Sequence, residues 1–435
     1  MVASPISAPP KRSRVSRIGG LLMWVFSIGL VAFLIIVLVI RFTTPIPLFR
    51  LRIVKDIPLP SALPTDPKSQ DPLAPGLAVR FDHFDFQALD PQTHLLFMTH
   101  SGPNPDKASS VNIHVDPAND GNVVVFDTVQ HKVVKVLAIP QTFGIAVAPD
   151  IHWVYIGDAR NGIIYGVDES TFKTVPIKLD PLDKPDAMVY DPVDHRMFVS
   201  DPGMPNPDAK TDQNIALKNQ NVAVIDVLNN TLVTKIPLGV DKPFGDDVAH
   251  AQYDITSHGI FVVTRPLHDQ NAQPNPLVTP PSFVEVIDPN LLSVILKIKL
   301  PDECVNPHGM VVDSDQETAF VVCINSQKLV RINLRTMQPF PDATLQQLPA
   351  GCDIAQLDHP LHVLFVGCTV GIAMFNEAGG QLTSLGSQFV SGGSNHTAFV
   401  NEETQEVYVP ITSAGDRPVL RILQYVPNGT ESSGT

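Results

Sequence analysis

A short hydrophobic run containing an aromatic residue recurs seven times along this chain. Each aromatic lies seven residues after an aspartate, alanine or asparagine, in the pairs Asp90 and Phe97, Ala148 and Tyr155, Asp191 and Phe198, Asp254 and Phe261, Asp313 and Phe320, Asp358 and Phe365, and Asn401 and Tyr408. Apolar runs of this length between turn residues predict β-strands joined by hairpins. A recurring period predicts repeated units, each of which needs a neighbour to cover its apolar face.

The same order of segments can be followed within each unit. Around Asp313, residues 308–313, 319–322 and 329–333 predict a strand, a tight turn, a second strand, a short loop and a third strand. A fourth apolar segment follows in most units, as at residues 232–238 and 292–298. Seven units of four antiparallel strands predict an all-β, seven-bladed β-propeller.

The two ends of the repeat array are complementary. The last unit ends with a third strand at residues 419–423 and has no fourth strand, whereas residues 50–60 match the fourth-strand pattern without a unit of their own. We therefore expect residues 50–60 to complete the seventh blade and to leave no open sheet edge. The propeller would span residues 50–427, followed by a polar tail at 428–435.

Three units are longer than the others by some 15 to 20 residues. The additional segments all fall between the second and third strands, at about residues 101–121, 202–220 and 266–282. In a propeller these loops lie at the face where each innermost strand begins, so we expect them to wall one mouth of the central channel. Long loops at one rim often carry function, although surface extension without a function is equally compatible with the pattern.

The N-terminal region differs from the repeats. Residues 18–40 contain no charged side chain and are long enough to cross a bilayer as a helix. The preceding residues 1–17 carry Lys11, Arg12, Arg14 and Arg17 and no acid, which favours a cytoplasmic N-terminus. No small-residue cleavage site follows, so we predict an uncleaved single-pass membrane anchor with the C-terminal domain outside the cytoplasm.

Charge limits the possible partners. The formal net charge is −14, and after residue 17 there are 26 basic against 44 acidic residues. Such a chain repels phosphate backbones, so nucleic acid is not expected as a partner.

The repeat resembles the bacterial YVTN-type β-propeller family. The resemblance is clearest at residues 222–226, which read Val-Ala-Val-Ile-Asp, and at residues 235–239, which read Lys-Ile-Pro-Leu-Gly. The second-strand segments depart from the family pattern, as at residues 154–157 and 198–201. The resemblance implies a propeller but no single activity, because such propellers include binding scaffolds, lactonase-like hydrolases, lyases and redox enzymes.

Alignment of the units collects polar residues into two columns. The first residue of each pair, such as Asp90, is here called the anchor of its unit. The position five residues before the anchor is occupied by Asp85, Phe143, Asp186, Ala249, His308, Asp353 and His396, with His250 one place further along. Ten residues after the anchor stand His100, Asp158, Asp201, Thr264, Cys323, Cys368 and Ile411. The hairpin between the columns is expected to pair Asp85 with His100, Asp186 with Asp201, His308 with Cys323 and Asp353 with Cys368.

These columns give the candidate site. We expect Asp85, His100, Asp186, Asp201 and Asp353 to bind a ligand at the channel mouth, and His250, His308 and His396 to hold a divalent metal ion. Paired carboxylates such as Asp186 and Asp201 would also shift each other's ionisation. The alternative is a structural role, in which the same side chains form hydrogen bonds between blades.

Four cysteines lie in two adjacent units. Outside the cytoplasm an even number favours disulfides, either Cys304 with Cys323 and Cys352 with Cys368, or a set that joins Cys304 to Cys352. Ligation of a soft metal together with His308 is a further alternative.

The sequence thus predicts a membrane-anchored, extracytoplasmic propeller that binds a small molecule or a protein at its channel mouth. A metal-dependent hydrolase or lyase with its site at the channel is the alternative, and an assembly module without a small-molecule site is a third. No catalytic residue is assigned.

Overall fold

The computed structural model describes eleven stretches of the chain: residues 49–60, 83–101, 121–203, 220–238, 246–266, 281–340, 346–369, 371–378, 382–389, 396–414 and 417–427. Phe49–Thr435 form one compact unit, distinct from Met1–Leu48. The predicted membrane anchor and most of the three predicted insertions lie outside the described residues. Within those residues, no helix has the length and apolarity needed to cross a membrane.

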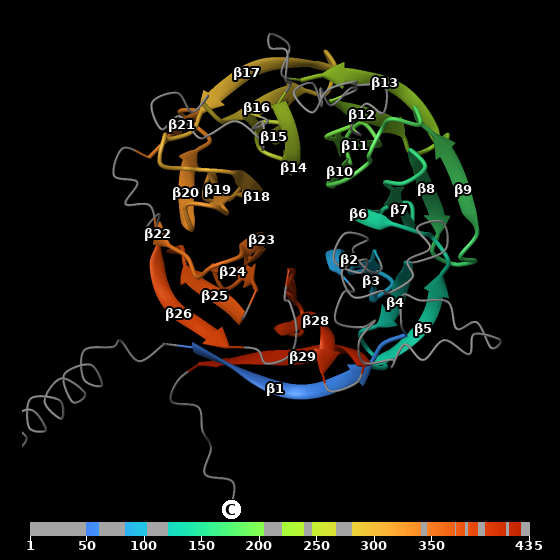
Figure 1. Cartoon of the computed structure of the whole chain (residues 1–435), viewed down its shortest axis with the longest axis vertical. Helices are drawn as coiled ribbons and strands as arrows, with labels where there is room; N and C mark the ends of the chain where they lie inside the picture. The colour runs from blue at the N-terminus through green and yellow to red at the C-terminus, as the bar shows by residue number, and fades with distance from the viewer. Residues whose placement is uncertain are drawn as a thin grey trace, which may run out of the picture. The chain divides into compact units, whose positions relative to one another are not determined.

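Seven antiparallel sheets surround a central channel, as expected for a seven-bladed propeller (Figure 1). Blade 1 contains β2 (Phe84–Asp90), β3 (Leu95–His100), β4 (Asn122–Asp127) and β5 (Lys132–Leu137). Blade 2 contains β6 (Thr142–Ala148), β7 (Trp153–Asp158), β8 (Ile163–Asp168) and β9 (Thr174–Lys178). Blade 3 contains β10 (Met188–Asp191), β11 (Arg196–Asp201), β12 (Asn221–Asp226) and β13 (Thr231–Pro237). Blade 4 contains β14 (Asp246–Asp254), β15 (Gly259–Pro266), β16 (Phe283–Asp288) and β17 (Ser293–Lys299).

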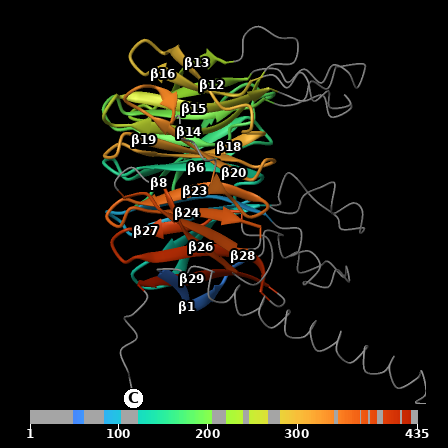
Figure 2. The same cartoon turned by 90° about the vertical axis from the view of Figure 1, so that its left-hand side faces the viewer.

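The remaining blades follow the same order. Blade 5 contains β18 (Pro307–Asp313), β19 (Thr318–Cys323) and β20 (Lys328–Asn333), and two short strands, β21 (Gln338–Pro339) and β22 (Gln346–Gln347), pair with β20. Blade 6 contains β23 (Cys352–Asp358), β24 (Val363–Cys368), β25 (Gly371–Asn376) and β26 (Thr383–Phe389). Blade 7 contains β27 (Phe399–Asn401), β28 (Glu406–Ala414), β29 (Arg417–Pro427) and β1 (Phe49–Pro58). Viewed from the side, the strands run between the two mouths of the channel (Figure 2).

The seventh blade joins the two ends of the array. Its strand order is β1-β29-β28-β27, so the segment nearest the N-terminus supplies the outermost strand (Figure 1). The guanidinium of Arg421 holds the carboxylate of Asp56 through two hydrogen bonds of 2.8 and 2.6 Å. This arrangement leaves no half-built sheet at the closure.

The seven-residue spacing has a local cause. The anchor carboxylate accepts hydrogen bonds from the backbone of the turn that follows it, as Asp90 does from Gln92 N–H at 2.7 Å. The residue four places after each anchor has a positive φ between 48° and 60°, and five of these seven residues are histidines: His94, His152, His195, His258 and His362. The aromatic at the seventh place is at most 1% exposed in every blade. A tight turn with one left-handed residue thus connects the anchor to the buried aromatic.

The hairpin register differs by one residue from the predicted one. Register irregularities in the innermost strands place the residue six before the anchor opposite the residue ten after it, so Phe84 faces His100 and Cys352 faces Cys368. Pro307 likewise faces Cys323. The predicted pairs Asp85 with His100, His308 with Cys323 and Asp353 with Cys368 are therefore wrong, because a bulge turns the residue five before the anchor away from its expected partner.

All four cysteines form disulfides. Cys304 is bonded to Cys323 and Cys352 to Cys368, with Cα atoms 5.2 and 3.7 Å apart. This leaves no thiolate for a metal ion and no link between Cys304 and Cys352. Disulfides are typical of proteins that fold outside the cytoplasm.

Candidate functional site at the channel mouth

Histidine and aspartate side chains from four blades meet at the mouth where the innermost strands begin. His308 Nδ1 lies 2.6 Å from Asp353 Oδ1, and His396 Nε2 lies 3.1 Å from Asp353 Oδ2. The same Nε2 atom lies 3.2 Å from Asp85 Oδ1. Asp353 therefore joins two imidazoles, and His396 in turn joins two carboxylates.

His83 belongs to this cluster and was missed by the sequence analysis. Its ring packs edge-on against His396 with centroids 4.6 Å apart, and one of its nitrogens lies within 4.8 Å of ligand atoms of Asp85 and His396. A usable signal existed, because residues two apart in an extended segment face the same side. His83 and Asp85 have this spacing.

Close backbone approach brings these side chains together. A Cβ atom on Gly309 would lie 1.9 Å from the Asp353 carbonyl oxygen, so only glycine permits the innermost strands of blades 5 and 6 to lie so near each other. Gly144 is equally constrained, with its hypothetical Cβ 1.5 Å from the Asp186 carbonyl oxygen. The glycine that follows His308 therefore helps to place that histidine beside Asp353.

The charges of the cluster support one another. Burial alone would lower the pKa of His396, but the carboxylates of Asp353 and Asp85 outweigh it and raise that pKa to about 9. Burial likewise opposes a charge on His308, yet Asp353 raises its pKa. Burial disfavours ionised Asp353 and Asp85, but the neighbouring histidines hold the pKa of both carboxyls below the usual value. The carboxylates and imidazoles of the mouth thus stabilise each other's charged forms.

His250 has a different state. Its side chain comes from β14, is 3% exposed, and has its pKa lowered to about 3 by burial and by nearby His308. Nδ1 accepts a hydrogen bond from the Met310 backbone N–H at 3.3 Å, so the proton of the neutral ring is on Nε2. Among the described residues, His250 Nε2 has no hydrogen-bond partner.

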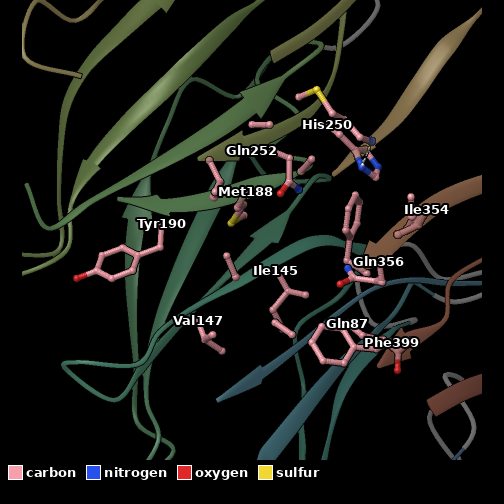
Figure 3. A pocket seen from close by; sticks show the side chains of 18 of the residues that line it. Gln87, Ile145, Val147, Met188, Tyr190, His250, Gln252, Ile354, Gln356 and Phe399 are labelled. Carbon is pink, nitrogen blue, oxygen red and sulfur yellow. Dashed lines mark hydrogen bonds between the residues drawn. The ribbon is translucent and has the colours of Figure 1, made fainter. Parts of the chain in front are cut away.

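A cavity of about 230 Å³ lies beside His250 in the channel (Figure 3). Its wall includes the apolar side chains of Phe86, Ile145, Met188, Ile354 and Phe399. The amides of Gln252 and Gln356 also line it, so the cavity combines an apolar body with a few neutral polar groups. This composition is typical of sites for small organic molecules.

Comparison with known proteins identifies the fold and nothing finer. No family profile matches the sequence, and a search of curated proteins finds no relative. A chain of hydrazine synthase from Kuenenia stuttgartiensis has a similar structure, with a TM-score of 0.54 and 14% sequence identity. The similarity covers 77% of the present chain and 94% of the other. At this identity the likeness shows a shared propeller fold, and no family match confirms the resemblance to YVTN-type propellers.

The other predicted residues are distributed differently. Asp186 is half-buried at the same mouth, and its charge contributes to raising the pKa of His308 and His396. His100 is fully buried, where its ring stacks on Phe84 with centroids 4.1 Å apart. His100 is therefore packed within its blade, where its charge contributes to lowering the pKa of His83.

Asp201 is held by groups of its own blade. Its Oδ1 accepts backbone hydrogen bonds of 2.8 Å from Lys184 and from Gly203. Burial and the charge of Asp183 raise the pKa of Asp201 to about 8. The carboxylate that most perturbs the ionisation of Asp201 is that of Asp183.

Proposed function

We propose that this protein is a binding module that takes a small molecule into its central channel through the His/Asp mouth. The fold favours such a role, because propellers commonly bind at one end of the channel. In this proposal the predicted helix at residues 18–40 holds the propeller at the outer side of a membrane, and the two disulfides favour that location.

The donor on His250 carries the proposal. A buried N–H group without an acceptor costs about 1–3 kcal/mol, so such groups are normally satisfied. His250 lines a cavity that has both apolar and neutral polar side chains, and its Nε2 donor has no partner among the described residues. A ligand that combines an apolar body with a carbonyl or carboxylate oxygen would satisfy both features. A bound water is the competing occupant.

Three probes of similar shape test the cavity. Saturation-transfer NMR on the full chain in detergent would compare benzamide, benzoate and toluene, which differ in the acceptor they present. We expect transfer to at least one of the two oxygen-bearing probes and much weaker transfer to toluene. His250→Phe should abolish the difference, whereas His359→Gln, in a residue that lines a different pocket, should preserve it. Equal binding of all three probes, or binding unchanged by His250→Phe, would refute the proposal.

A metal-dependent hydrolase or lyase is the second candidate, and the histidine and carboxylate cluster favours it. Such an enzyme needs a bound ion beside a substrate cavity, and both elements would lie at the same mouth. Hydrolysis of p-nitrophenyl acetate by the zinc-supplemented protein provides a first test. Activity lost in His396→Gln would support this candidate, whereas activity equal to that of free zinc ions would count against it.

A further inference from the structure

We propose that His83, Asp85, Asp353 and His396 form a binding site for one divalent transition-metal ion at the channel mouth. His396 Nε2 lies 3.2 Å from Asp85 Oδ1 and 3.1 Å from Asp353 Oδ2. Ligand atoms that each lie about 2.0–2.2 Å from one ion are separated by about 3.0–3.5 Å. The ligand atoms of His396 and of the two carboxylates therefore have the spacing of neighbouring ligands, and a nitrogen of His83 lies within 4.8 Å of ligand atoms of Asp85 and His396.

The donor set selects the class of metal. Two imidazoles and two carboxylates suit zinc and its first-row neighbours, whereas calcium and magnesium prefer sites built of oxygen alone. Two carboxylates also balance the charge of a divalent cation. In the metal-free arrangement the His396 ring lies between these carboxylates, where the ion would replace its N–H as their partner.

His308 orients one of the proposed ligands. Its Nδ1 hydrogen-bonds Asp353 Oδ1 at 2.6 Å and leaves Oδ2 directed toward His396. Hydrogen bonds of this kind to metal-binding carboxylates fix the ligand and raise metal affinity. His308 is thus a positioning residue, and Gly309 permits the close strand approach that places it there.

His250 supplies the second observation that points to a ligand. Its nearly buried ring lies 5.1 Å from the His308 ring, centroid to centroid, and its Nε2 has no partner among the described residues. Because Nδ1 accepts the Met310 N–H, Nε2 carries a proton and does not coordinate the ion. In this proposal His250 donates to a molecule bound beside the metal, although its ring also lies within reach of ligand atoms of His308 and Asp353.

Two other groups of similar composition serve the hairpins. Asp191, Asp194 and His258 approach one another, as do Asp313, His362 and Glu377. Asp191 and Asp313 are anchors whose Oδ1 atoms cap their own turns, and His258 and His362 occupy left-handed turn positions. Their geometry is explained by the turns, so these groups provide matched controls.

Metal binding to the untagged full chain in detergent tests the proposal. After chelation and gel filtration, we expect the protein to take up one Zn²⁺ per chain, and Co²⁺ to give a visible spectrum that Zn²⁺ abolishes. Anomalous diffraction at the zinc edge should place the ion between His396 and Asp85. Calorimetric titration should show at least about 100-fold weaker binding in Asp85→Asn and His396→Gln, and about 10-fold weaker binding in His308→Gln.

The control is His258→Asn, which removes an imidazole beside a carboxylate but keeps a residue suited to a left-handed turn. It should retain full zinc affinity. Absence of stoichiometric zinc in the wild-type protein would overturn the metal site, as would zinc located at a hairpin group. Binding of benzamide by the metal-free protein reports on the cavity separately, so failure of one proposal is distinguishable from failure of the other.

Discussion

Blades 3 and 6 carry different chemistry at equivalent positions of the same hairpin. Ten residues after the anchor, blade 6 has Cys368, which is bonded to Cys352 across the hairpin. Blade 3 has Asp201 at that place, where backbone N–H groups of Lys184 and Gly203 hold its carboxyl group. One blade thus ties the open end of its hairpin covalently, and the other ties it through a buried acid.

The two blades also show why burial alone does not decide ionisation. Asp353 in blade 6 and Asp201 in blade 3 are 6% and 0% exposed. The pKa of Asp353 is lowered because two histidines outweigh the effect of burial, whereas burial and the charge of Asp183 raise the pKa of Asp201 to about 8. The sign of the neighbouring charge separates a candidate ligand from a structural acid.

Removal of the covalent tie should have the largest effect. We expect Cys352→Ala combined with Cys368→Ala to lower the free energy of unfolding by about 3 kcal/mol, because a short loop is no longer closed in the unfolded chain. Urea denaturation of oxidised protein measures this loss. The control is a variant in which Cys304 and Cys323 are also replaced. The stability of this cysteine-free variant should be the same with and without a reductant. A double variant as stable as the parent would show that the backbone hairpin alone holds blade 6.

Loss of the central carboxylate should come next. Asp353→Asn leaves the imidazoles of His308 and His396 without a shared counter-charge, so we expect metal-free protein to lose about 2–3 kcal/mol of stability at pH 7. Asp186→Asn changes the equivalent position of blade 3, where the side chain is half-buried, and should cost less. Urea denaturation in the presence of a chelator compares them. Equal losses would remove the distinction between the two blades at this position.

The sequence predicted the repeat well because each unit repeats one physical requirement. A capped turn followed by a buried aromatic leaves a fixed spacing, and seven such spacings with one missing strand indicate a closed ring. The same alignment of the units on their anchors places Asp85, Asp353, His308 and His396 at one mouth. The inclusion of both pairs of cysteines in adjacent units likewise favoured the disulfides that are observed.

The site was predicted less completely because its details depend on a bulge. A shift of one residue sends the side chain of His100 to a different neighbour, and nothing in the spacing of the anchors reports such a shift. His83 precedes the repeat and so falls outside the aligned columns. The role of His250 depends on the backbone N–H of Met310, a contact between blades that no local pattern encodes.

For the buried Asp201 of blade 3 we predict that a substitution stabilises the protein, in contrast to the losses expected above. Asp201→Asn resembles the protonated acid, and its amide can donate to Asp183 Oδ1, which lacks a partner among the described residues. Because the folded pKa is about 8 and the unfolded one about 4, the native state holds a proton that the unfolded state releases. Wild-type stability from this group therefore falls as pH rises from about 4 to about 8.

Asp201→Asn lacks that loss, so the stability of the variant relative to the parent should rise as the pH rises from about 4 to about 8, with the two nearly equal at about pH 4. Denaturation at several pH values measures the difference. The charge of Lys235 on Asp183 belongs to the same network, so Lys235→Met, which leaves Asp183 without its cation, provides the converse variant and should be destabilising. A constant difference between parent and Asp201→Asn across this range would mean that Asp201 is ionised in the folded protein.

The seventh blade uses a third kind of tie, an ion pair, and it should contribute least. The carboxylate of Asp56 on β1 is about one-third exposed, whereas the Arg421 side chain that holds it is 9% exposed. Asp56→Asn keeps the shape but removes the charge, so we expect a loss of about 1 kcal/mol that diminishes at high salt. Glu303→Gln removes an exposed carboxylate elsewhere and should change stability little. Urea denaturation at several salt concentrations compares the two variants. If Asp56→Asn lost as much free energy of unfolding as the disulfide variant, ring closure would constrain the propeller at least as strongly as the disulfide of blade 6.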